Sequence, residues 1–192
     1  MLKLLFTNFA ALMLALMQLG CSINVKKNEE QGEKKKVDIT TPVGGIHVSQ
    51  EADPHATGLD VYPGAKLIEK DENGEDKSAN VNISTGLFGV KVVAQQYQSD
   101  AAPEKLIDYY TGQLKRFGKV LECHSSWKGS HASISHSSDS SKQLKCDQGS
   151  GEATELKVGT EDHQRIVSIA PEGKGSKFAL VLVEIRGRQD TI

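Results

Sequence analysis

The residues most able to do chemistry gather in one segment between two cysteines. This segment holds a tryptophan, nine serines between Ser125 and Ser141, and three histidines: His124, His131 and His136. Neighbouring imidazoles can bind Zn²⁺ or Cu²⁺. A metal site also needs ligands held in place by surrounding groups, and no helix or strand pattern runs through this segment. We therefore interpret residues 124–143 as a disordered Ser/His-rich loop without metal, and keep a histidine metal site as the alternative.

Trp127 stands apart from the other residues of this loop. An exposed tryptophan often marks a contact surface, so we predict a partner contact there. The alternative is that Trp127 packs back onto the folded domain. The catalytic motifs G-x-S-x-G and H-E-x-x-H, the P-loop and the dinucleotide fingerprint do not occur in the sequence. We expect no enzymatic activity and no bound cofactor.

The first residues are typical of an export signal. Lys3 precedes a mostly apolar run over residues 4–19, which ends at Gly20 and Cys21. A membrane-spanning helix needs about 20 apolar residues, so a cleaved signal over residues 1–20 fits better. The stretch MQLGC at 17–21 resembles a lipobox, in which a signal peptidase cuts before a diacylated cysteine. This resemblance implies lipidation of Cys21, while the alternative is an ordinary secretory signal.

The residues that follow Cys21 indicate the expected location of the protein in the cell. In lipoproteins of the enteric type an Asp at this place favours the inner membrane, so Ser22 indicates the periplasmic side of the outer membrane. Residues 26–36 are almost wholly charged and polar and cannot bury enough apolar surface to fold. We expect residues 21–36 to form a flexible tether, and fifteen extended residues reach about 50 Å.

Two cysteines remain once Cys21 is lipidated, namely Cys123 and Cys146. In an oxidising compartment, an even pair is most simply a disulfide. The alternative of a reactive or metal-bound thiol pair lacks the usual C-x-x-C spacing. We predict a Cys123–Cys146 disulfide that closes the Ser/His-rich loop at its base.

Charge argues against one class of partner. Removing residues 1–20 deletes only Lys3 and leaves 22 basic and 25 acidic residues. A protein without a basic excess has no electrostatic footprint for nucleic acid. The expected partners are therefore the membrane, through the lipid, and another protein of the envelope.

Residues 37–192 predict a single α+β domain. An N-terminal β-hairpin is expected over residues 37–48, where apolar and polar residues alternate around Pro42. Alternating or apolar runs predict further strands over residues 65–68, 80–85, 90–98, 119–123, 144–146, 155–160, 164–170 and 177–186. The last of these is apolar on both faces and should be covered on both. We expect the helix to cover one face and the hairpin to cover the other.

One helix is expected over residues 103–117. Pro103 suits its first turn, and Leu106, Tyr110, Leu114 and Phe117 form one apolar stripe. Gly112 lies off that stripe, so we expect it to be exposed. Ser99 or Asp100 is expected to cap the helix.

Residues 62–65 (YPGA) and 102–110 (APEKLIDYY) resemble a recurrent module of exported bacterial proteins, most of them uncharacterised. That module combines a "YPGA" segment with an "SPEK…FY…L" helix before an antiparallel sheet. The likeness covers roughly residues 37–123 well. It implies the α+β fold and an envelope location, and it implies no catalytic residue.

Overall fold

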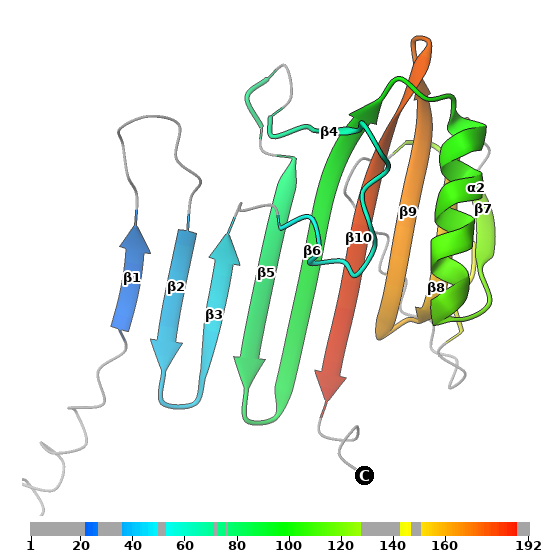
Figure 1. Ribbon diagram of the computed structural model, residues 1–192. Helices are drawn as coiled ribbons and strands as arrows, with labels where there is room; N and C mark the ends of the chain where they lie inside the picture. Colours follow the sequence, from blue (N-terminus) through cyan, green and yellow to red (C-terminus); the bar gives the residue numbers. More distant parts are fainter. Residues whose placement is uncertain are drawn as a thin grey trace, which may run out of the picture.

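The computed structural model describes residues 22–26, 36–49, 53–70, 73–75, 77–127, 143–146 and 151–187. These residues form an antiparallel sheet with one main helix on one of its faces (Figure 1). The α+β prediction is therefore confirmed. The strands run in the order β1-β2-β3-β5-β6-β10-β9-β8-β7, and the short β4 pairs with β6.

The strand bounds follow the alternating and apolar runs of the sequence. They are β1 Ser22–Lys26, β2 Lys36–Thr41, β3 Gly44–Ser49, β4 Lys66–Leu67, β5 Ser78–Thr85, β6 Phe88–Ser99, β7 Leu121–Ser125, β8 Ala153–Thr160, β9 His163–Glu172 and β10 Gly175–Gly187. The predicted hairpin is confirmed as β2 and β3. The strand predicted at 144–146 is not formed, and only an isolated bridge joins Gln143 to Thr160.

The helix agrees with the predicted stripe except at Phe117, which is exposed because it lies in the 3-10 turn after the α-helix. It comprises α2, Pro103–Leu114, and one 3-10 turn, η1, Lys115–Phe117. Leu106, Tyr110 and Leu114 are buried. The predicted side-chain cap is absent: Ala102 is the N-cap residue, and the Ser99 hydroxyl accepts a hydrogen bond from the Ala101 N–H instead (3.1 Å).

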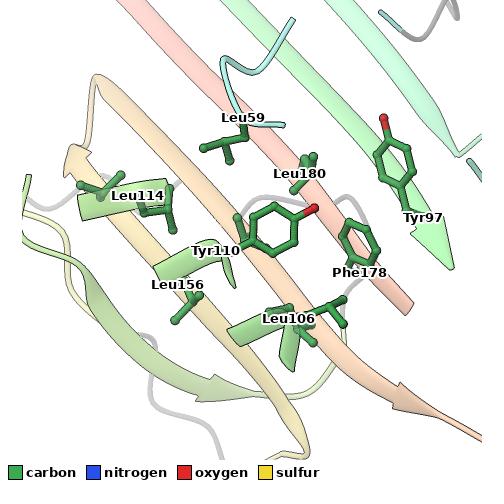
Figure 2. Close-up of a cluster of buried hydrophobic side chains, with 11 residues drawn as sticks. Leu59, Tyr97, Leu106, Tyr110, Leu114, Leu156, Phe178 and Leu180 are labelled. Atoms are coloured by element: carbon green, nitrogen blue, oxygen red, sulfur yellow. The ribbon is translucent and has the colours of Figure 1, made fainter. Parts of the chain in front are cut away.

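The core lies between α2 and the sheet (Figure 2). The rings of Tyr110 and Tyr97 both lie against Phe178 of β10, with centroids 5.5 Å and 5.3 Å away. Leu156 of β8 and Leu180 of β10 are fully buried beside them. Burying such side chains supplies the main stabilising free energy of a small domain.

The YPGA segment docks against the helix. The Tyr62 N–H donates a hydrogen bond to the Tyr110 hydroxyl (3.0 Å), and the Tyr62 ring meets the Tyr109 ring edge-on. The Gln113 amide exchanges two hydrogen bonds with the backbone of Asp60, at 2.8 and 3.1 Å. Gly64 has φ +80°, which favours glycine at this turn. These contacts explain why the two halves of the motif occur together in this chain.

Two expectations about the N-terminal part are wrong. The hairpin does not cover β10: it pairs with β5 and so widens the sheet at one edge. The predicted tether is also shorter than 21–36, because Ser22–Lys26 forms β1 in register with β2, and Lys36 already belongs to β2. Residues 27–35, which remain of the tether, lie outside the described residues. The signal at 1–20 lies outside them as well.

Candidate interaction surface

The predicted cysteine pair comes together as a disulfide. Cys123 and Cys146 have Cα atoms 5.4 Å apart and are 23 residues apart in the sequence. Cys123 is buried on β7, in register with Glu155 of β8. The disulfide therefore ties residues 143–146 to the edge strand of the sheet.

Trp127 packs back onto the sheet. It is partly buried against a cluster on the face opposite α2, made by Ala94, Ile166, Ala179, Val181 and Val183. The Lys177 ammonium lies 5.4 Å from the centre of the indole ring, within reach of a cation–π interaction. Trp127 is thus held by the sheet, and its predicted contact with a partner stays a prediction.

The histidines of the predicted loop are divided by the structure. His124 is exposed on β7, with its Nε2 atom 3.9 Å from Oε1 of Glu122. The strand also includes Ser125, so the loop begins after residue 125 rather than at 124. His131 and His136 lie outside the described residues. Within the described part of the chain, no group of three His, Cys, Asp or Glu side chains could hold a metal ion.

Cys21 also lies outside the described residues, and its lipidation stays a prediction. None of the helices that the structure describes is long and apolar enough to cross a membrane.

The sheet face opposite α2 carries two straight rows of aliphatic side chains across five neighbouring strands. Register pairs place five valines in one row: Val37, Val48, Val81, Val92 and Val183. The next row on the same face is Ile39, Ile46, Ile83, Val90 and Ile185. All ten side chains are β-branched and suit a flat pleated surface. We call these ten residues the aliphatic face.

The other face of the same strands is polar, because side chains alternate along a strand. In register across β2, β3, β5 and β6 stand Asp38, His47, Asn82 and Lys91. The imidazole Nδ1 of His47 and the carboxylate of Asp38 pair across the hairpin. This part of the sheet therefore has one polar face and one apolar face. An apolar sheet face is normally buried against another structural element.

The described elements bury one end of the aliphatic face more than the other. At the β10 end of the rows Val183 is fully buried, close to Trp127. Towards β3 the face opens, and the Ile46 side chain is 38% exposed. Helix α2 packs on β8 and β9, whereas β2, β3 and β5 make their main contacts with neighbouring strands only. The rows span on the order of 350 Å²; Ile46 is exposed, Val183 is buried, and the other eight side chains are partly buried.

A buried ion pair lies at the other end of this sheet face. Lys157 Nζ is 3.0 Å from Glu155 Oε2, and both belong to β8. Their side chains are only 4% and 9% exposed. Burying two charges is costly, and their close pairing offsets part of that cost. Nothing in the sequence pattern indicated it.

The aliphatic face was also missed by sequence reasoning. The alternation in residues 37–48 and 80–85 was visible, but it shows only that each strand has one apolar side. The rows arise from the register between strands, which brings together residues far apart in the chain. That register depends on the whole sheet.

Comparisons with known proteins give no relative: no family model, no curated protein and no solved structure matches the chain. The resemblance to the YPGA module therefore stays a prediction.

Proposed function

We propose that this chain is a lipid-anchored protein of the bacterial cell envelope, and that its domain binds another envelope protein through the aliphatic face. The observation that carries this proposal is the pair of cross-strand rows, one of valines and one of isoleucine with valine. The domain acts as a binding module, without catalysis and without a cofactor.

The physical argument rests on the difference between the two sheet faces. The face with Asp38, His47 and Asn82 is suited to water, while the aliphatic face offers a flat array of rigid side chains. β-Branched side chains have few rotamers to lose when a partner packs on them. An apolar centre bordered by polar groups is the usual composition of a protein interface. Trp127, at the β10 end, is placed to border the contact.

The proposed address rests on the signal-like residues 1–20, on Cys21 and on the disulfide. Disulfides persist in oxidising compartments such as the periplasm and are rare in the cytosol. The Cys123–Cys146 pair therefore supports export. Ser22, directly after Cys21, supports the outer membrane.

The partner proposal is tested with two matched variants of β5. Val81→Asp places a carboxylate on the aliphatic face, whereas Asn82→Asp places the same group on the polar face one residue further along. Each tagged variant is purified from solubilised envelopes, and the accompanying proteins are quantified by mass spectrometry.

We expect a specific partner to be recovered with the native chain and with Asn82→Asp, and to be lost with Val81→Asp, because an unpaired carboxylate is costly to bury. Thermal unfolding of both variants checks that the domain is folded. Recovery of the same proteins at the same levels with all three chains would contradict the proposal.

The anchor is tested separately. The mature N-terminal peptide should begin at Cys21 and carry the mass of a diacylglycerol group in mass spectrometry. An unmodified N-terminal peptide would remove the anchor, while the binding surface could still be tested as above.

A further inference from the structure

Two tight turns lie at the same end of the sheet. Register places the β2–β3 turn, Pro42–Val43, beside the β5–β6 turn, Gly86–Leu87, because Gly44 pairs with Thr85. β10 ends at this level as well, where Gly187 pairs with Phe88. Figure 1 shows both turns at the lower end of the sheet, together with the start of β1 and the end of β10.

Large apolar side chains are exposed at this end. The exposed fractions are 77% for Val43, 59% for Leu87 and 45% for Phe88. Ile46, two positions into β3, is also exposed. Phe117 is the other exposed large apolar side chain among the described residues, and it lies beneath the Arg165 guanidinium, 3.9 Å from its ring centre. Among the described residues, the exposed large apolar side chains other than Phe117 therefore lie on the two turns or in the strand ends beside them.

The two turns and the strand ends that flank them carry no charged side chain. Residues 39–46 (ITTPVGGI) and 83–90 (ISTGLFGV) contain no charged side chain. On β2 and β6 the first charged residues, Asp38 and Lys91, lie in one row across the sheet, whereas Arg186 of β10 lies nearer the tips. Beyond that row the strands continue for about three residues, or about 10 Å. That length is similar to the depth to which amphipathic helices bury their apolar face in the boundary region of a bilayer, about 5–10 Å.

The rest of this end carries an acidic turn and an arginine. The acidic turn of Glu161 and Asp162 joins β8 to β9 and is level with Ile185, whose N–H donates to the Asp162 carbonyl (2.7 Å). Because Ile185 pairs with Val90, the turn is set back from the tips and lies level with the innermost of residues 83–90. Arg186 pairs with Gly89 near the tips and is exposed, where a guanidinium suits lipid phosphate. At the opposite end, the β9–β10 turn carries Glu172 and Lys174.

The start of the described chain points to the same end. Ser22 pairs with Thr40, one residue from the end of β2, and Cys21 is one peptide bond further. Consecutive Cα atoms are 3.8 Å apart.

We propose that this end of the sheet, residues 39–46 and 83–90, inserts into the boundary region of a lipid bilayer, with the strands standing upright on it. The orientation rests on the proposed anchor at Cys21. The domain then stands directly on the membrane, and the valine row of the aliphatic face, which lies beyond the inserted residues, points sideways along it, open to a neighbouring envelope protein.

The test uses the full processed protein in vesicles of phosphatidylethanolamine and phosphatidylglycerol. The vesicles contain a phospholipid with a photoactivatable acyl chain, and labelled residues are mapped by mass spectrometry. We expect labels in residues 39–46 and 83–90. Labels confined to other described segments, such as the β9–β10 turn, or absent from both turns, would overturn the inference.

Two variants sharpen this test. Replacing Val43, Leu87 and Phe88 together by Ser should lower the labelling of both turns at least about tenfold. Each apolar side chain contributes favourable free energy to the transfer of the turns from water into the bilayer. The control Phe117→Ser removes an exposed apolar side chain away from the turns and should leave labelling unchanged. Equal labelling of the native and triple-variant turns would contradict the proposed insertion.

The same digests separate this inference from the anchor. An acylated peptide starting at Cys21, with unlabelled turns, overturns the membrane-facing end and leaves the anchor intact. An unacylated peptide overturns the anchor, and labelling of the turns in purified protein added to the vesicles then decides the inference alone.

Discussion

Val48 of β3 lies directly opposite Val81 of β5, on the sheet face that α2 leaves uncovered. The two residues are 33 positions apart in the sequence, and their pairing lies near the middle of the aliphatic face. Because β-branched side chains directly opposite each other pack closely, they form a rigid and flat apolar surface. This relationship links the strand register to the proposed binding function.

The helix contains one glycine whose replacement should stabilise the protein. Gly112 is exposed in α2, and a Cβ atom there would meet nothing within 4 Å. Gly112→Ala should raise the free energy of unfolding by about 0.5–1 kcal/mol, because alanine loses less backbone entropy in a helix. Urea unfolding of the variant measures this difference.

Gly159 provides the opposite case. Its φ is +106°, and a Cβ atom would lie 2.0 Å from the His163 carbonyl oxygen. Gly159→Ala should lower the free energy of unfolding by more than about 1 kcal/mol. A destabilising Gly112→Ala would contradict the open space described around Gly112. A neutral or stabilising Gly159→Ala would contradict the close contact described at Gly159.

The disulfide should stabilise the domain measurably. Cys123 and Cys146 close a loop with a sequence separation of 23, for which the chain-entropy model gives about 3 kcal/mol. Replacing both cysteines by serine should therefore lower the urea midpoint at neutral pH. Reduction of the native protein should produce a similar shift and leave the variant unchanged. An identical midpoint in all samples would show that the bond adds no stability.

Alkaline pH should destabilise the protein through Tyr97. Burial, followed by the charge of Asp53, raises the pKa of Tyr97 to about 12. The unfolded chain has a tyrosine pKa of about 10 and releases the proton first. The contribution of Tyr97 is therefore complete below pH 10 and is lost as the pH rises from about 10 to about 12.

Tyr97→Phe tests this directly. At pH 8 the variant should be less stable by about 1 kcal/mol, because the Tyr97 hydroxyl donates to Gln95 Oε1 (2.8 Å). Between pH 10 and 12 the difference should narrow, since phenylalanine has no proton to release. Urea unfolding across this pH range measures the difference, and a constant gap would disagree with the raised pKa.

Local patterns predicted the parts of the fold that depend on neighbouring residues. The stripe of Leu106, Tyr110 and Leu114 indicated α2, and counting cysteines indicated the disulfide. In both cases the signal lies in residue types and spacing alone. The predicted side-chain cap is wrong because the Ser99 hydroxyl accepts its hydrogen bond from the Ala101 N–H, which precedes the helix, and Ala102 occupies the N-cap position.

Non-local pairing accounts for what could not be predicted. Ser22–Lys26 was interpreted as part of a tether because a five-residue strand carries little signal without its partner, β2. The hairpin was expected to cover β10 because the apolar run predicts that Val181 and Val183 are buried. The run does not indicate which element covers them, and in the structure both are buried. The order of the strands, and with it the aliphatic face, depends on contacts across the whole chain.

The most direct measurement of the proposed function uses two neighbouring positions on β3. A photo-crosslinking amino acid replaces Val48, on the aliphatic face, or His47, on the polar face, in cells that make the processed protein. After irradiation, we predict a discrete adduct with one envelope protein from position 48 and none from position 47. Adducts of equal yield at both positions, or none at position 48, would contradict the assignment of the aliphatic face as the binding surface.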